Sequence, residues 1–305
     1  MPNNLHNLLN SLRRCSDKHR MAMTQTDIQT YYRDFWKKMD EQTNASESGD
    51  SLAYSSPIED AVVYPIYKRL IADLGIKADQ GDILDIGTGA GRWTRFILNN
   101  FTPDSILGVD FAESSVELLN QWSKSLTSPS KVSFQAADIT DPDCSIEGKF
   151  DLINIANVLF HIPEPEKFEQ ALCNIAGLLA QGGRVVTTEY LPRTSMRTQW
   201  MAVRSRYEFT AACENVGLEI ADIRACSFFS NDPMGIDGPD NATRLHFNKV
   251  KTMTAQLMSG LTTDQSRGFV TELFAEIEHA TLAFCSERIA QTDMPAQKLV
   301  VLRKR

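Results

Sequence analysis

One stretch of the chain, "ILDIGTGAGRWTRFI" (residues 83–97), constrains the fold more than any other. An apolar run is followed by Gly87, Gly89 and Gly91 and then by apolar residues at helical spacing. This pattern predicts a buried strand, a tight turn and a helix. Glycines at such a turn let the backbone bend sharply and let a ligand approach it, at the edge where open α/β sheets bind small molecules. The sequence therefore predicts a ligand site at this turn.

From residue 81 onward, short apolar segments alternate with helical patterns, which is typical of a mostly parallel sheet covered on both faces. Strands are expected at 82–87, 105–111, 132–138, 150–157, 183–191, 218–228 and 297–303. The predicted fold is α/β and Rossmann-like: a seven-stranded, mostly parallel sheet with helices on both faces, an N-terminal helical lid and a helical insertion before the last strand. We expect the lid at 1–80, the core at 81–229, the insertion at 230–295 and the final core strand at 296–305.

Helical patterns also lie outside this core. A helix is expected over 26–39, and another follows Ser56 as its N-cap, begins at Pro57 and stops at Gly75. The insertion shows helical patterns at 242–259 and 263–291. The first twenty residues carry leucines at helical spacing followed by basic residues, which fits either a surface-seeking, transit-like helix or a frayed or docked terminal helix.

Composition excludes several classes of protein. The formal net charge of −8 argues against a broad nucleic-acid-binding face. Apolar residues make up 42% and charged residues 23%, as in globular proteins, and no apolar run approaches the ~20 residues of a membrane span. The start lacks the apolar core of a secretory signal, so we expect a cytoplasmic protein. The six cysteines are scattered without metal-ligand spacing, which predicts reduced, mostly structural thiols.

The glycine spacing argues against two classes of ligand site, one for dinucleotides and one for nucleotide phosphates. A dinucleotide site needs G-x-G-x-x-G, but the third glycine position is Arg92, which argues against a nicotinamide-dependent dehydrogenase. A Walker-type phosphate loop needs Gly-Lys-Ser/Thr after the glycines, and none follows.

The chain resembles the class I S-adenosylmethionine (SAM) dependent methyltransferases of the small-molecule type. In that family the first strand ends in an acid followed by G-x-G-x-G, matched here by Asp85 and the three glycines. Acids at the ends of the second and third strands are matched by Asp110 and Asp138, and "FDLINIANVLFHIPEPEKF" is similar to the family's fourth strand and loop. The resemblance covers residues 81–190, with a weaker match over the last two strands.

The resemblance implies that SAM is the cofactor and S-adenosylhomocysteine (SAH) the product. It places Asp110 at the ribose hydroxyls, Asp138 and the amide of Ile139 at the adenine, and Asp85 at the amino group of the methionine moiety. The implied cofactor-binding residues are Asp85, Gly87, Thr88, Gly89, Gly91, Asp110, Phe111, Asp138, Ile139 and Asn157. The alternative is that these are turn glycines and helix-capping acids.

Methyl transfer from a sulfonium needs positioning and exclusion of water more than a special catalytic group. For a hydroxyl acceptor a general base helps, and the candidates are His161 and then Glu189. Alternatively, His161 only shapes its loop, and Glu189 is solvated or ion-paired. No metal is expected, because metal-dependent members of the superfamily carry an aspartate after the fourth strand, where this chain has Asn157 and Val158.

Acceptor recognition is expected outside the core. The segment "LPRTSMRTQWMAVRSRYEF" (191–209) is rich in arginines and suits a carboxylate, a phosphate or a sugar face. Alternatively, Met196, Trp200, Val203 and Tyr207 form one buried helical stripe. The candidate substrate-binding residues are Tyr32, Trp36, Arg193, Arg197, Trp200, Arg204 and Tyr207.

The preferred hypothesis is methylation of a hydroxyl on a small molecule or sugar. The alternatives are N-methylation of a small amine and a SAM-binding partner subunit without catalysis. The insertion at 230–295 is expected to cap the acceptor pocket or to form a homodimer.

Overall fold

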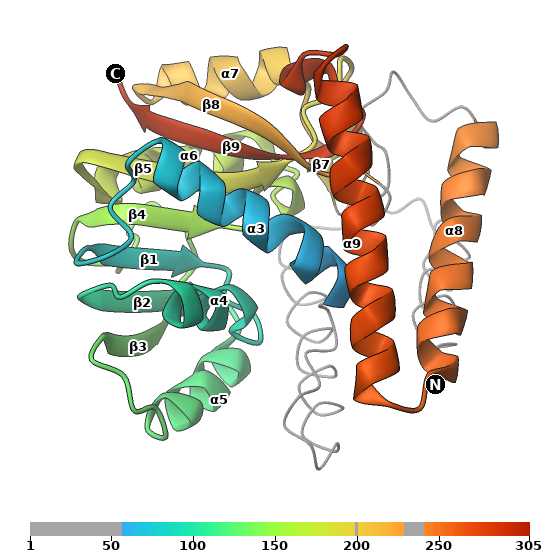
Figure 1. The fold of residues 1–305 in the computed structure, drawn as a ribbon. Coiled ribbons are helices and arrows are strands. Elements are labelled where there is room, and N and C mark those ends of the chain that lie inside the picture. The colour runs from blue at the N-terminus through green and yellow to red at the C-terminus, as the bar shows by residue number, and fades with distance from the viewer. Residues whose placement is uncertain (1–56, 199–200, 229–240) are drawn as a thin grey trace, which may run out of the picture.

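A computed structural model describes residues 57–198, 201–228 and 241–305 (Figure 1). The strands are β1 (Asp82–Ile86), β2 (Ser105–Asp110), β3 (Lys131–Ala136), β4 (Phe150–Ile155), β5 (Leu179–Glu189), β6 (Met196–Arg197), β7 (Ala202–Val203), β8 (Leu218–Ser227) and β9 (Gln297–Lys304). The α-helices are α3 (Pro57–Asp73), α4 (Arg92–Asn100), α5 (Glu113–Ser123), α6 (Pro165–Leu178), α7 (Arg206–Asn215), α8 (Asn241–Gly260) and α9 (Asp264–Ser286). Two 3₁₀ turns are η1 (Leu159–His161) and η2 (Gln291–Asp293).

The main sheet has seven strands in the order β3-β2-β1-β4-β5-β9-β8. Strands β1 to β5 pair in parallel, whereas β9 runs antiparallel to both of its neighbours, β5 and β8. All strands except β9 therefore end at one edge, and β9 begins there. The predicted seven-stranded, mostly parallel Rossmann-like sheet is confirmed.

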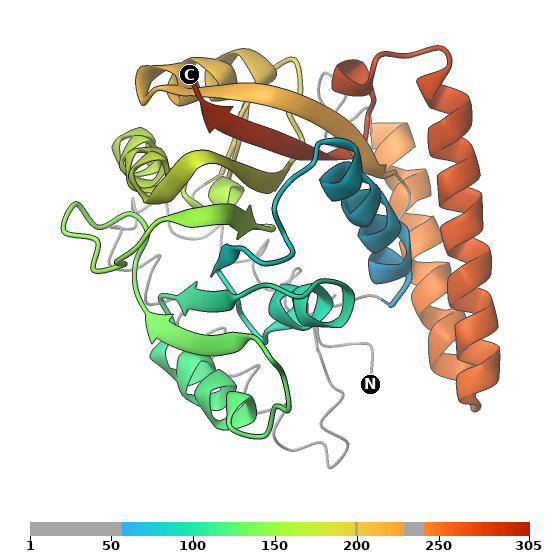
Figure 2. The same cartoon turned by 60° about the vertical axis from the view of Figure 1, so that its left-hand side comes forward.

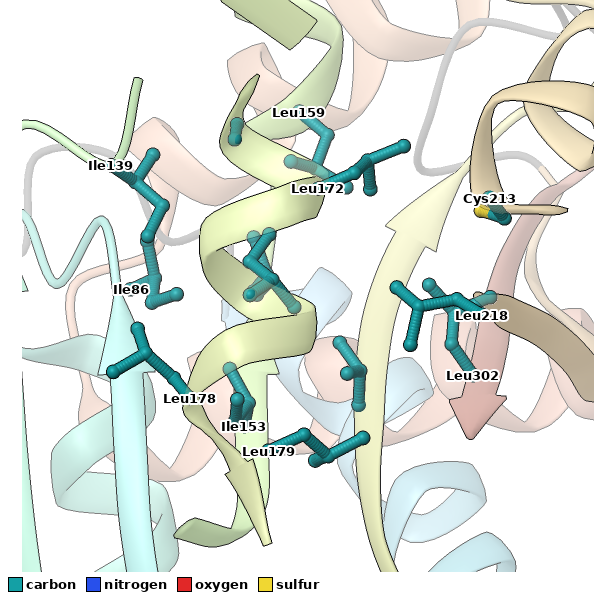
Figure 3. Close-up of a cluster of buried hydrophobic side chains, with 14 of the residues drawn as sticks. Ile86, Ile139, Ile153, Leu159, Leu172, Leu178, Leu179, Cys213, Leu218 and Leu302 are labelled. Carbon is teal, nitrogen blue, oxygen red and sulfur yellow. The ribbon is translucent and has the colours of Figure 1, made fainter. Parts of the chain in front are cut away.

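Successive side chains of a strand point to opposite faces of the sheet. Because helices cover both faces, the central strands carry mainly apolar side chains on each side. In β4, Ile153 joins the cluster under α6 and α7, which Figure 3 shows around Leu172 and Leu178. Its neighbour Leu152 belongs to the cluster under α3 and α4. Figure 2 shows these helices on the two sides of the sheet. Continuous apolar runs thus became buried strands because both faces are covered.

Helix α3 covers the sheet and also carries α9. Pro57 is its first residue, and Gly75 ends it with φ 57°, where the amide of Ile76 donates to the carbonyl of Ile71 at 3.0 Å. Helix α9 packs against α3, and the ring nitrogen Nε2 of His279 lies 2.9 Å from the carbonyl of Val62. The helical insertion is therefore attached to the core through α3. Within the described part of the chain, no helix combines the length and apolar character needed to cross a membrane.

The segment after β5 does not form the helical stripe considered as an alternative. Met196 and Arg197 pair antiparallel with Val203 and Ala202, and the amide of Thr198 donates to the carbonyl of Met201 at 2.8 Å. The helix begins only at α7, where the hydroxyl of the N-cap residue Ser205 accepts from the amide of Glu208. Tyr207 is 85% exposed, so it lies on the solvent side of α7.

Lys298 fixes the start of β9 at the edge of the sheet where the other strands end. Its side chain is fully buried, and Nζ donates to the carbonyls of Tyr190, Met294 and Ala296 at 2.6–2.9 Å. Burial lowers the pKa of Lys298 to about 8. Because all three donors are used, the ammonium acts as a structural clamp between β9 and the chain that leaves β5.

Candidate functional site

The parallel strands bring the predicted cofactor residues together at one edge of the sheet. The glycine loop 87–91 follows β1, Asp110 ends β2, Asp138 follows β3, Asn157 follows β4 and Glu189 ends β5. These residues are far apart in the sequence, and parallel pairing alone places them at a common edge.

The glycine loop has two reasons to lack side chains. Gly87, Gly89 and Gly91 all have positive φ, at 71°, 50° and 79°. A Cβ on Gly87 would lie 2.3 Å from Cγ2 of Val158, and one on Gly91 would lie 2.6 Å from Cδ2 of Leu119. The turn therefore needs glycine for its own packing as well as for close approach of a ligand.

Asp110 joins two turns through one carboxylate. Oδ2 accepts from the amide of Gly89 at 2.9 Å, and Oδ1 accepts from the amide of Ala112 at 3.0 Å. The side chain is only 7% exposed, so these charge-assisted bonds are shielded from water. Phe111 lies between the two anchored positions and is half-buried. The carboxylate thus holds the glycine loop against the turn after β2.

Asp85 is the centre of a buried polar network under α3 and α4. Thr94 donates to Oδ2 at 2.6 Å, and Asn154 donates to Oδ1 at 2.8 Å. The hydroxyl of Tyr67 in turn donates to Asn154 at 3.1 Å. Burial, partly offset by these bonds, raises the pKa of Asp85 to about 6. Both carboxylate oxygens of Asp85 have partners within the protein, and its predicted contact with the methionine amino group stays a prediction.

Three further cofactor candidates lie beside these anchors. Asp138 accepts at Oδ1 from the amide and the hydroxyl of Thr140, both at 2.8 Å. The side chain of Ile139 is buried in the cluster under α6 (Figure 3). Thr88 is 5% exposed, and its hydroxyl has no hydrogen-bond partner in the described part of the chain. A buried hydroxyl of this kind needs a partner, which a ligand can supply.

His161 ends the short turn η1 after β4. Its ring lies 4.5 Å from that of Phe160, between centroids, and burial lowers its pKa to about 4. The imidazole is therefore neutral at physiological pH. A neutral imidazole can accept a proton, but a conjugate acid of low pKa makes it a weak base.

Two of the predicted acceptor-binding arginines hold the turn that carries His161. Arg204 donates to the carbonyl of Ile162 at 2.6 Å, and its guanidinium lies 3.4 Å from the ring centroid of Phe168. Arg197 donates to the carbonyl of Pro163 at 3.0 Å and pairs with Glu208. Burial lowers the pKa of Arg204 to about 10. In this structure these side chains contact backbone that flanks His161.

Glu189 is buried beside this turn. It is 3% exposed, and the hydroxyl of Thr187 donates to Oε1 at 3.4 Å. Burial raises the pKa of Glu189 to about 8 despite the charge of Arg204. The carboxyl group is therefore protonated at neutral pH, unlike the solvated carboxylate considered as an alternative.

The remaining acceptor candidates are two exposed side chains and three residues outside the described part of the chain. Arg193 and Tyr207 have exposed side chains. Tyr32, Trp36 and Trp200 lie outside the described residues.

The structure adds residues that the sequence reasoning missed. Asn154 was a polar residue within an apolar strand, which is a recognisable signal for a buried partner. Arg92 pairs with Asp60 and lies 3.6 Å from Glu59, so it joins α4 to the first turn of α3. Gln297, at the start of β9, donates to Asn157 at 2.7 Å and carried no signal in the sequence.

Residues 83–183 match the protein family described as the methyltransferase domain. This part of the chain is a methyltransferase domain. The match confirms the predicted methyltransferase domain over residues 83–183, and the order and direction of the strands confirm the predicted fold.

Relatives place the methyltransferase domain among enzymes of varied substrates. A chloroplastic tocopherol O-methyltransferase of Arabidopsis thaliana is 27% identical over 154 residues, which are 50% of this chain and 42% of that protein. A malonyl-acyl-carrier protein O-methyltransferase of Paenibacillus sp. (strain JDR-2) is 31% identical over 122 residues, 39% of this chain and 42% of that protein. These alignments span less than half of either relative.

A solved magnesium protoporphyrin IX methyltransferase from Synechocystis PCC 6803 with bound SAH shares the fold. Its TM-score is 0.50 at 17% identity, covering 66% of this chain and 94% of that chain. Likeness at this identity concerns architecture alone.

The glycine loop provides a direct test of the cofactor site. We expect Gly87→Ala to weaken SAH binding at least about tenfold, because the new methyl group collides with Val158 and the backbone has a positive φ. The matched control is Gly177→Ala in α6, where a Cβ meets nothing within 4 Å. Isothermal titration calorimetry measures both. Unchanged affinity in Gly87→Ala would contradict the placement of the site at this loop.

The buried Glu189 predicts an unusual dependence of stability on pH. Its folded-state pKa is raised, so the stability that it contributes is present at low pH and is lost as pH rises from about 4.5 to about 8. Glu189→Gln stays neutral, and we expect its free energy of unfolding to gain on wild type by roughly 1–3 kcal/mol between pH 5 and 8. Urea unfolding measures this, with Glu117→Gln on the exposed face of α5 as control. Parallel curves for wild type and Glu189→Gln would show that Glu189 ionises normally.

Proposed function

We propose that the protein transfers a methyl group from SAM to an oxygen atom of a small molecule. The observation that supports this most is the convergence of the glycine loop, Asp110 and Asp138 at one sheet edge. SAM supplies an electrophilic methyl group on a sulfonium, so the protein's own task is to bind, orient and exclude water.

The residues at the edge fit SAM. Asp110 is anchored so that its remaining lone pairs suit the ribose hydroxyls, and Asp138 with the amide of Ile139 suits the adenine. The hydroxyl of Thr88 has no partner among the described residues and suits a polar group of the cofactor. Asp85 would influence the methionine end through Thr94 and Asn154, which fix α4 and β4 around the loop.

An oxygen acceptor is supported by the relatives and by the state of the candidate bases. Both curated relatives are named O-methyltransferases. Of the two candidate bases, Glu189 holds its own proton at neutral pH, whereas His161 is neutral and can accept one. We therefore assign proton acceptance to His161 and a hydrogen-bonding or structural role to Glu189.

N-methylation of a small amine remains the alternative reaction, and a SAM-binding subunit without catalysis is the alternative from another class. An amine acceptor needs no group with the role assigned to His161. A sugar as acceptor, the cytoplasmic location and the division of the chain at residues 80, 229 and 295 also stay predictions from the sequence.

The proposed function is tested by incubating the protein with methyl-labelled SAM and an extract of its native cell, then separating products by size. Label in the small-molecule or polysaccharide fraction supports the proposal and yields a compound to identify. Label in protein alone overturns the acceptor class. Binding of SAH without transfer to any fraction supports the non-catalytic subunit.

The role of His161 has its own test once an acceptor is in hand. The lowered pKa predicts that kcat/KM does not fall between pH 8 and pH 5, and that its acidic limb lies near 4, where the imidazole gains a proton. His161→Ala should lower kcat about 10²-fold or more, as for other general bases. Near-normal turnover in this variant, with SAH affinity unchanged, removes the general-base assignment and favours an amine acceptor.

The predicted homodimer gains support from one exposed helix face. On α9, a row formed by Phe269, Leu273, Ile277 and Phe284 is 47–66% exposed and has a phenylalanine at each end. A second copy packed antiparallel would pair these ends, and it would set Arg267 near Glu287 of the partner subunit. A large exposed apolar row of this kind is typical of an interaction site.

Light scattering at ~50 µM, the range of weak to moderate dimers, tests the dimer. We expect wild type to be dimeric and Leu273→Asp to be monomeric. Leu257→Asp, on the exposed side of α8, is the control and should leave the dimer intact. A monomeric wild type overturns the homodimer.

A further inference from the structure

Asn157 is held in an uncommon backbone conformation at the rim of the site. It is the second residue after β4 and has φ 60°, in the left-handed region that costs most residues energy but that asparagine tolerates. Its backbone amide donates to Oγ1 of Thr188 at 2.7 Å, and the same hydroxyl donates back to Oδ1 of Asn157 at 3.0 Å. Strain of this kind persists where neighbours hold it in place.

The second bond to this carboxamide comes from the far end of the chain. Nε2 of Gln297 donates to Oδ1 of Asn157 at 2.7 Å across 140 residues. Gln297 is the first residue of β9 and is 1% exposed. It reaches the rim only because β9 runs antiparallel to β5, so that its start lies where the parallel strands end. Oδ1 of Asn157 thus accepts from both Thr188 and Gln297, which determines the orientation of its carboxamide.

The residue after Asn157 contacts the glycine loop. Cγ2 of Val158 occupies the space that a Cβ on Gly87 would need, at 2.3 Å from its ideal position. The backbone that Asn157 fixes therefore sets where Val158 lies, and Val158 in turn bounds the turn at Gly87. A chain of direct contacts runs from β9 to the loop after β1.

We propose that Gln297 is a positioning residue of the cofactor site: through the carboxamide of Asn157, the last strand holds the loop after β4 against the glycine loop. The identity of the ligand rests on the proposed function. Gln297 acts through the carboxamide of Asn157, to which it donates. The last strand thereby shapes the site although it lies outside the matched segment 83–183.

The test is a double-mutant cycle read by SAH affinity. Gln297→Met removes the donor at similar length, and Asn157→Gly removes the carboxamide while allowing the positive φ. Loss of one buried hydrogen bond of this kind predicts about tenfold weaker SAH binding for Gln297→Met. In the Asn157→Gly background, Gln297→Met should change SAH affinity less than about twofold, because its route to the site is already absent.

The control separates positioning from stability. Oε1 of Gln291 accepts from the amide of Ala225 at 2.7 Å, so Gln291→Met also removes a glutamine hydrogen bond to β8. We expect its midpoint of thermal unfolding to fall while SAH affinity stays within about twofold of wild type. Equal weakening of SAH binding in Gln291→Met and Gln297→Met would reduce Gln297 to a general structural role and overturn the inference.

The remaining outcomes are also decisive. The inference fails if Gln297→Met leaves SAH affinity unchanged. It also fails if the losses of SAH affinity caused by the two substitutions multiply fully in the double variant. If Gln297→Met does not fold, Gln297→Ala removes the same donor with a smaller side chain, and the same cycle is run with Asn157→Gly. If the wild-type protein binds no SAH, the proposed function is contradicted. If the wild-type protein binds SAH but the effects of the two substitutions on SAH affinity are independent, only the role of Gln297 is contradicted.

Discussion

The parallel pairing of β1 with β2 on one side and β4 on the other is the constraint on which the site depends. Ile86 lies opposite Val109 in β2 and Ile155 in β4, so the loops that follow these strands leave the sheet side by side. Only then can the carboxylate of Asp110 reach the amide of Gly89. Only then can Val158 pack against Gly87. The apolar side chains on both faces stabilise this pairing, and the polar groups at its edge use the resulting proximity.

Burial shifts several ionisable groups at or near the sheet edge toward their neutral forms. Burial raises the pKa of Asp85 to about 6 and that of Glu189 to about 8, and it lowers the pKa of His161 to about 4. Each shift follows from the cost of placing a charge where water is excluded. A dry environment of this kind suits methyl transfer, because water competes with the acceptor for the methyl group. The same exclusion of water therefore shifts these pKa values and favours the methyl transfer proposed here.

The residues assigned to the cofactor and those assigned to the acceptor lie in two different halves of the sheet edge. The glycine loop after β1, Asp110 at the end of β2 and Asp138 after β3 occupy one half of the sheet edge, and they carry the cofactor assignment. The other half is built from η1, the β6–β7 hairpin and α7, where Arg204 and Arg197 hold the backbone around His161. Within the proposed function, we assign acceptor choice to this second half, because relatives of the domain are named for different substrates.

The sequence by itself determined the seven strands, the glycine turn and the acids that end the strands, because these depend on local apolar runs, turn residues and their order. The pairing of β6 with β7 escaped prediction, because the helical spacing of apolar residues in this segment was overridden by the hairpin that Thr198 closes. The protonated Glu189 and the link from Gln297 to Asn157 were decided only by the tertiary structure. Burial and contacts across 140 residues depend on how strands and helices pack, and no local pattern in the chain encodes them.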